Sequence, residues 1–182
     1  MTPFLLGRVS SPLGGILLVS DGEKRLVALD FETHEARMHQ LLRRHHGGEL
    51  PGLVERPAPA VMASALDAFF AGEVTAIDGL AVHTGGTAFE QTVWAALRGI
   101  PAGTTTTYGR LAASLGRPSA SRAVGRANGA NPVGIVIPCH RVIGADGSLT
   151  GYGGGIERKR WLLAHEGGAR GAVPSRASQR AK

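Results

Sequence analysis

The chain of 182 residues has very little cysteine, and Cys139 is its single thiol. One thiol excludes an intramolecular disulfide and a cysteine-rich metal site, because both need further cysteines. The N-terminus lacks the basic start and long apolar stretch of a secretion signal, so we expect the chain in a reducing cytoplasm. Cys139 is then either a small buried side chain or a nucleophile.

Long apolar runs are also missing, and acidic residues become scarce along the chain. No run reaches the roughly 18 apolar residues of a membrane span, so we expect no membrane partner. Residues 1–87 carry 7 basic and 10 acidic side chains, residues 88–166 carry 9 and 4, and residues 167–182 carry 4 and none. A basic half of this kind favours a polyanionic partner. We expect residues 168–182 to be a disordered basic tail.

The first half of the chain alternates strand-like and helix-like segments. Short apolar segments are separated by turn signals, and Asp21-Gly22 is typical of a hairpin. A pattern of helical spacing follows later and stops at Gly72. The sequence therefore predicts a small α/β domain over residues 1–83, with strands at 4–9, 16–20, 26–31 and 74–82, helices at 34–44 and 58–70, and a linker at 49–57.

The second half is predicted to be mainly helical. Apolar residues at helical spacing indicate helices over 89–97, 108–116 and 120–128, and Ser119 is a candidate N-cap for the third. The last two are short and joined by a tight turn that contains Gly116. This is the pattern of a helix-turn-helix.

The third of these helices has features of a DNA-recognition helix. Arg122 and Arg126 lie four residues apart and therefore share one face. Small residues such as Ala123 and Gly125 let a helix backbone approach a groove closely. The same small residues could equally pack against a neighbouring helix.

Cys139 follows an apolar run in this basic half. We expect residues 135–137 to be buried, and burial by itself raises the pKa of a thiol. His140 comes next and is a natural base, although adjacent residues meet only where the backbone bends or a water bridges them. Pro138 makes such irregular backbone expected. The base needs an orienting acid, and spacing does not choose among Glu90, Asp146, Glu157 and Glu166.

The ordered motifs of this half resemble the O6-alkylguanine-DNA alkyltransferases. The run Pro138-Cys139-His140-Arg141-Val142, preceded by Asn131-Pro132, is similar to the active-site motif of that family. The resemblance is close over residues 88–167 and extends to the first half in outline, and on this basis we expect Cys139 to be a nucleophile. The other matching segments are residues 107–112, 121–125, 151–155 and 161–167.

The resemblance implies a two-domain DNA repair protein. Its fold would be an N-terminal α/β domain with a ribonuclease H-like sheet over residues 1–83, then a mainly α-helical domain with a winged helix-turn-helix over 88–167. The implied activity is that of a methylated-DNA–protein-cysteine S-methyltransferase. It would move the alkyl group of O6-alkylguanine, and of O4-alkylthymine, from double-stranded DNA to Cys139. The transfer would be irreversible, so that each chain, a monomer without metal or cofactor, reacts once.

Site roles follow from the matching positions. His140 would act as the base through a water, held by Glu166, and Asn131 would brace the turn before the active-site segment. Arg122 would take the place of the flipped nucleotide, and Tyr108 would contact the DNA backbone or donate a proton near the base. The pocket would be formed by Val142, Tyr152 and Gly153, and the recognition helix would present Ala123, Gly125 and Arg126 to DNA.

The sequence departs from the pattern of some family members at two points. Some members have serine where this chain has Gly153, so a hydrogen bond there must come from backbone N–H. Residues 1–87 contain no cysteine, so the N-terminal zinc site of some members is not supported.

Two other functions compete with the repair hypothesis. One rival is a non-catalytic protein that flags lesions or regulates transcription. The other is a cysteine hydrolase with a Cys-His-Glu triad, which leaves the basic helix-turn-helix unexplained.

Overall fold

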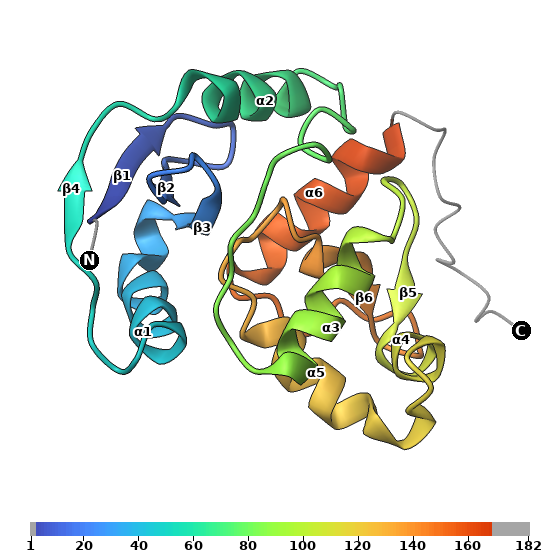
Figure 1. Ribbon diagram of the computed structural model, residues 1–182. Helices are drawn as coiled ribbons and strands as arrows, with labels where there is room; N and C mark the ends of the chain where they lie inside the picture. The colour runs from blue at the N-terminus through green and yellow to red at the C-terminus, as the bar shows by residue number, and fades with distance from the viewer. Residues whose placement is uncertain (1–2, 169–182) are drawn as a thin grey trace, which may run out of the picture.

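The computed structural model describes residues 3–168 and divides them into a sheet-containing part and a helical part (Figure 1). The predicted basic tail, residues 168–182, lies outside the described residues except for Gly168. The predicted order of an α/β part followed by a mainly helical part is confirmed. The α-helices are α1 (Glu35–His45), α2 (Ala60–Phe70), α3 (Ala88–Arg98), α4 (Tyr108–Ser114), α5 (Ser121–Gly129) and α6 (Ile156–Gly168).

The sheet of the first part has the strand order β3-β2-β1-β4. The first three strands form an antiparallel meander, and the fourth pairs in parallel with β1. Every residue of β2 and β3 is buried. Both faces of the sheet are therefore covered, which explains why these strands are largely apolar along their whole length. The strands are β1 (Phe4–Val9), β2 (Ile16–Ser20), β3 (Leu26–Phe31) and β4 (Leu53–Glu55), and the first three confirm the predicted segments.

Alternate residues of β2 face two different cores, as the two-residue period of a strand requires. Leu17 and Val19 pack in one core with Met38 of α1. Ile16 and Leu18 face the opposite core, which contains α2 residues and most of the buried side chains of the helical part. The second core thus joins the two parts of the molecule.

Two predictions in the first part are wrong. Residues 49–57, predicted as a linker, contain β4, a strand too short to show a detectable alternation. Residues 74–82, predicted as a strand, form turns, and Val82 makes only an isolated bridge to Leu26. Asp78-Gly79 lies inside that segment, and both residue types favour turns over strands.

Helix α3 opens the second part with a capping box. Thr87 Oγ1 accepts a hydrogen bond from Glu90 N at 3.2 Å, and Glu90 Oε2 accepts one from Thr87 N at 2.9 Å. On the buried side of the helix, Trp94 Nε1 donates to Ala127 O of α5 at 2.8 Å. The predicted helix at 89–97 is confirmed. Its Trp94 hydrogen bond attaches the buried face of α3 to α5.

The helix pair α4 and α5 is confirmed, with boundaries within two residues of those predicted. Gly116, with a φ of 69°, ends the turn after α4. A 3-10 turn, Pro118–Ala120, connects to α5. The prediction of Ser119 as N-cap is wrong, because Ser119 lies inside that turn and α5 begins after Ala120 without a side-chain cap.

The free edge of β3 joins the two parts. Leu29 N donates to Pro132 O at 2.9 Å, and Gly134 N donates back to Leu29 O at 2.9 Å. The connector that follows α2 uses the same edge at Leu26. The N-terminal sheet thereby extends into the segment that leads to Cys139.

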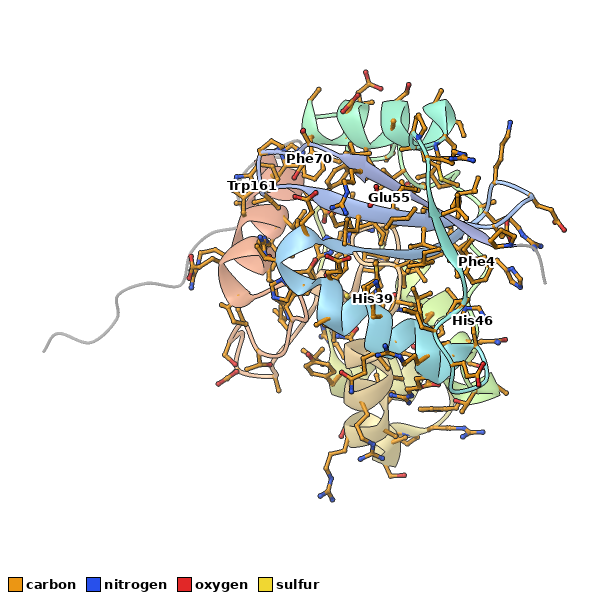
Figure 2. All side chains as sticks on the ribbon, turned by 90° about the vertical axis from the view of Figure 1, so that its left-hand side faces the viewer. Phe4, His39, His46, Glu55, Phe70 and Trp161 are labelled. Atoms are coloured by element: carbon orange, nitrogen blue, oxygen red, sulfur yellow. The ribbon has the colours of Figure 1, made fainter. Side chains whose placement is uncertain are left out.

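Aromatic residues hold α6 against α2 (Figure 2). The rings of Phe70 and Trp161 lie with centroids 5.9 Å apart. His165 stacks on Trp161 at 4.7 Å, and its Nε2 makes a hydrogen bond to Phe69 O at 2.7 Å. These contacts support the C-terminal helix, which carries Glu166.

Gly7 in β1 offers a test of this packing. A Cβ at Gly7 would lie 2.7 Å from Cα and 2.9 Å from N of Ala58, backbone atoms that cannot swing aside. We expect Gly7→Ala to lower the free energy of unfolding by about 1–3 kcal/mol, the usual cost of overpacking, in urea denaturation. The matched control is Gly52→Ala, whose Cβ would have its nearest neighbour at 3.9 Å. Equal losses in the two variants would contradict the prediction.

Candidate active site

Cys139 begins a buried 3-10 turn, Cys139–Arg141, at the end of the apolar segment. Residues 135–137 are buried as predicted, and Cys139 itself is 5% exposed. Ile135 has a φ of 69°, a left-handed conformation that costs a β-branched residue about 1–2 kcal/mol. The surrounding contacts have to hold this strained segment in place.

Asn131 supplies two of those contacts. Its Nδ2 donates to Ile137 O at 2.8 Å, and its Oδ1 accepts from Val133 N at 3.0 Å. Asn128 adds a longer hydrogen bond, 3.4 Å, from its Nδ2 to Cys139 O. Because Asn131 is buried, its side chain ties the two ends of the segment together without competition from water.

The resting form of Cys139 is the uncharged thiol. Burial raises the pKa of this thiol, and it is opposed by a hydrogen bond from Asn131 and by the positive charges of Arg37 and Lys159. A thiol in such surroundings becomes a nucleophile only when a base removes its proton.

His140, Arg141 and Glu166 form a buried network beside the thiol. His140 Nε2 lies 2.8 Å from Glu166 Oε1. Arg141 donates from Nη2 to the same oxygen at 2.8 Å and from Nε to Glu166 Oε2 at 2.9 Å. Arg141 Nη1 reaches Ile100 O at 2.5 Å. The two carboxylate oxygens are thereby satisfied, although Glu166 has no exposed surface.

The protonation of this network follows from its pKa values. Burial by itself raises the pKa of Glu166, but hydrogen bonds from His140 and Arg141 outweigh it and lower that pKa to about 2. The ionised carboxylate only accepts hydrogen bonds, so the proton of His140 sits on Nε2. Burial also lowers the pKa of His140, against the opposing effect of Glu166, and the ring is neutral.

Nδ1 of His140 is consequently a free base. This nitrogen is buried and has no hydrogen-bond partner among residues 3–168. Of the four acids that spacing left open, Glu166 is the one that contacts His140. Glu90 caps α3, Asp146 closes a loop turn and Glu157 makes an exposed ion pair within α6.

A small cavity lies against the thiol at the boundary between the two parts. Tyr152 and Gly153, both predicted pocket residues, line it together with Cys139. The opposite side of the cavity comes from the first part of the chain, with Asp30 of β3 and Arg37 of α1. Burial raises the pKa of Tyr152, so its hydroxyl stays protonated.

Lys159 links two other predicted site residues. Its buried Nζ donates to Val142 O at 2.6 Å and to Thr150 O at 2.8 Å. Tyr108 OH donates to the same Thr150 carbonyl at 3.3 Å. Val142, in β6 (Val142–Ile143), is fully buried and does not line the cavity. Lys159 and Thr150 therefore connect Tyr108 to the backbone of Val142, and neither of these two predicted site residues lines the cavity.

The helix pair presents unpaired positive charge. Arg122 and Arg126 of α5 and Arg110 of α4 are exposed, and none lies within ion-pair distance of a carboxylate in the described part of the chain. Gly125 faces Tyr108, since a Cβ there would lie 3.7 Å from the tyrosine ring. Free guanidinium groups on one helix pair are complementary to a phosphate backbone.

Three residues of the site carried no role in the sequence predictions. Arg141 belongs to the quoted motif, but a basic residue there gave no sign of an ion pair with Glu166. Lys159 sits in a run of three basic residues that resembles a solvated surface. Lys159 lies three residues before Leu162 and seven before Glu166, and both of these are buried. That helical spacing places Lys159 on the buried face of α6, and it is the signal that could have found this residue. Arg37 lies in the other half, where no sequence signal points to the thiol.

Comparison with known proteins identifies the family. A family model described as 6-O-methylguanine DNA methyltransferase, DNA binding domain, matches residues 88–168. A second, 6-O-methylguanine DNA methyltransferase, ribonuclease-like domain, matches residues 6–84. Fold and site thus define a two-domain protein with a ribonuclease-like first domain and a DNA-binding second domain. The chain belongs to the 6-O-methylguanine DNA methyltransferase family.

Individual relatives agree with this assignment. The chain is 50% identical to the methylated-DNA–protein-cysteine methyltransferase of Salmonella typhimurium, over 92% of this chain and 98% of the relative. It is similar to the crystal structure of Mycobacterium tuberculosis OGT in complex with DNA, with a TM-score of 0.77 and 40% identity over 91% and 94% of the two chains. The predicted enzyme class and its role in direct-reversal DNA repair are confirmed, and the non-catalytic alternative is not favoured.

Residues 3–168 contain neither a membrane-spanning helix nor a clustered set of metal ligands. No helix there is long and apolar enough to cross a bilayer. In the same residues, no three side chains of His, Cys, Asp or Glu are grouped so that they could hold a metal ion.

Glu166→Gln tests the buried network. The substitution keeps the shape of the side chain but leaves Arg141 buried without a counter-ion. We expect the free energy of unfolding at neutral pH to fall by about 3–5 kcal/mol, the cost of breaking a buried pair, in urea denaturation. The control is Glu157→Gln, which removes an exposed ion pair within the same helix and should change stability little.

Wild type and Glu166→Gln should also differ in how their stability depends on pH. The folded pKa of Glu166 is about 2, below its ordinary value of 4.5, so its ionisation stabilises the fold above pH 4.5. That contribution is lost as the pH falls towards 2. The stability gap between wild type and Glu166→Gln should narrow across this range. A gap that stays constant on acidification would contradict the assigned ionisation state.

Proposed function

We propose that this chain repairs O6-alkylguanine in double-stranded DNA by moving the alkyl group to Cys139. The observation that carries the proposal is a buried thiol next to a neutral histidine, His140. The Nε2 atom of this histidine is held by the ionised Glu166, which leaves Nδ1 free. A hydrolase could use a similar triad, but the unpaired arginines of the helix pair favour a nucleic-acid substrate. O4-alkylthymine offers the same kind of oxygen-bound alkyl group and is a second substrate of this proposal.

The transfer is an in-line displacement at the alkyl carbon. The Cys139 proton moves to His140 Nδ1, directly or through one water, and Glu166 stabilises the resulting imidazolium. The sulfur then bonds to the alkyl carbon while the C–O6 bond breaks, and its electron pair stays on the guanine oxygen. A proton delivered to the leaving base neutralises it. Tyr108 is the candidate donor, since burial raises its pKa and keeps its hydroxyl protonated.

The base has to leave the duplex to reach the thiol. Guanine O6 lies inside the base stack, so the nucleotide must be flipped, which costs a few kcal/mol. The pair α4 and α5 acts as a helix-turn-helix, with α5 in the groove, and Ala123 and Gly125 allow its close approach. Arg122 replaces the flipped base in the stack, and Arg126 contacts phosphate, which offsets the cost. Tyr152 and the backbone of Gly153 and Val142 receive the base.

The acceptor is consumed by the reaction. A thioether is a poor leaving group, and no second thiol exists in the 182 residues to release the alkyl group. Each molecule therefore reacts once, as a cytoplasmic monomer that needs no metal or cofactor. Residues 1–83 and 88–167 are the two domains of this proposal, with Asn131 bracing the active-site turn of the second.

Intact mass measurement tests the transfer. After incubation with a duplex that carries O6-methylguanine, the wild-type chain should gain one CH2 unit and no more, however large the excess of DNA. Cys139→Ser should gain nothing, because an alcohol is a far weaker acid and nucleophile than a thiol.

Three outcomes would overturn this function. Repair that continues beyond one guanine per chain points to a turning-over hydrolase or transferase. Repair of the lesion by Cys139→Ser shows that the thiol is not the acceptor. Binding of the lesion without any mass gain supports the non-catalytic alternative.

Arg122→Ala tests base flipping. We expect the rate of methyl transfer from duplex DNA to fall at least about tenfold, since one lost charge-assisted contact is worth 1.5–3 kcal/mol. Labelling of Cys139 by iodoacetamide, which needs no DNA, should be unchanged. The control is Arg56→Ala, an exposed arginine of the first domain with the same loss of charge. Equal slowing in both variants would indicate a general charge effect.

A further inference from the structure

The cavity against Cys139 is too small for a nucleobase. Its volume is about 10 Å³, close to the space that one water molecule needs. Pockets for small organic ligands usually enclose roughly 300–1,000 Å³. The structure is therefore a closed form, and part of the lining has to move before a base can reach the thiol.

Arg37 is the part of the lining that fills the space over Gly153. A Cβ built on Gly153 would lie 2.4 Å from Arg37 Cζ and 2.5 Å from its Nε and Nη2, so the guanidinium rests directly on this glycine. Gly153 lines the cavity together with Cys139. The position that a flipped base would need beside Gly153 is thus occupied by an arginine of the other domain.

Three hydrogen bonds hold Arg37 in this position. Nη1 donates to Asp30 Oδ2 at 2.5 Å, and Nη2 donates to Gly129 O at 3.0 Å and to Asn131 O at 3.3 Å. Asp30 is buried, and its other oxygen accepts from Phe31 N at 2.9 Å. Gly129 ends α5, and Asn131 begins the turn towards the thiol. Arg37 therefore connects the first domain to both the recognition helix and the active-site turn.

An open groove lies on the other side of Arg37. It has a volume of about 590 Å³ and is lined by residues of α1, α3 and α5, including Arg44 and Arg126. Among the residues that the structure describes, Arg37 alone lines both the groove and the cavity. Its side chain is 25% exposed, so rotation about its flexible stem has room on the groove side.

We infer that Arg37 is a gate that covers Cys139 in the DNA-free protein and swings into the groove when a base is admitted. Asp30 sets the closed position. A phosphate held near Arg126 would compete for the guanidinium with the carbonyl oxygens of Gly129 and Asn131, because hydrogen bonds between two charged groups are the stronger ones. The inference rests on the acceptor role proposed for Cys139, and it gives the first domain a part in the reaction.

Labelling by iodoacetamide without DNA tests the gate. Release of a charge-assisted hydrogen bond corresponds to about tenfold in an equilibrium, so Arg37→Ala should be labelled at Cys139 about tenfold faster than wild type. An electrostatic role predicts the opposite sign, since the Arg37 charge lowers the pKa of the thiol and its loss would leave less thiolate. Unchanged or slower labelling overturns the gate.

Gly153→Ala opens the gate from the other side and leaves Arg37 in the chain. Its Cβ would displace the flexible end of the arginine, so labelling should also become faster than in wild type. In the Arg37→Ala background, the same substitution should add nothing, because the group it displaces is gone. If the two substitutions increase the labelling rate of Cys139 additively, the inference is overturned. This comparison keeps the inference testable even if one single variant folds poorly.

Arg44→Ala is the matched control. Arg44 lies on the same helix, lines the same groove and pairs with Glu90, but it does not line the cavity. Its labelling rate should equal that of wild type, and an equal increase would show loosening of α1 instead of gating. Methyl transfer from duplex DNA, measured in parallel, reports on the proposed function separately, since a failed gate leaves that transfer intact.

Discussion

The hydrogen bonds between the free edge of β3 and the segment before Cys139 are the constraint on which the site depends. Leu29 exchanges backbone hydrogen bonds with Pro132 and Gly134, so the strained segment leading to the thiol is held as an extension of the sheet. An exposed strand edge is usually a liability. Here the second domain covers that edge and gains a rigid support for its reactive residue.

This arrangement puts ionisable groups where water does not reach, and the structure compensates each of them. Glu166 receives hydrogen bonds from His140 and from Arg141, and Lys159 is satisfied by backbone carbonyl oxygens. The result is a neutral imidazole whose Nδ1 has no other partner in the described chain. The hydrogen bond to Glu166 holds the ring in a fixed orientation and leaves Nδ1 as its free acceptor.

The sequence predicted most of the fold because its elements have clear local signals. Strands β2 and β3 are largely apolar, and helices α3, α4 and α5 have apolar residues at helical spacing. Helix α6 was not predicted. The errors fall where local signals are weak. β4 is three residues long and exists only through its pairing with β1, and residues 74–82 have apolar content but turn residues at their centre. Ser119 lost its expected capping role to a 3-10 turn.

The candidate site divides in the same way. The sequence by itself determined the thiol, its neighbouring histidine and the family, because Cys139, His140 and their motif are contiguous. It also determined the charge of the DNA-facing half. Only the tertiary structure decided that Glu166 receives a bidentate Arg141, that Lys159 is buried, and that Arg37 lines the cavity. These are contacts between residues distant in the chain, and their geometry depends on how the two domains pack, which no local pattern encodes.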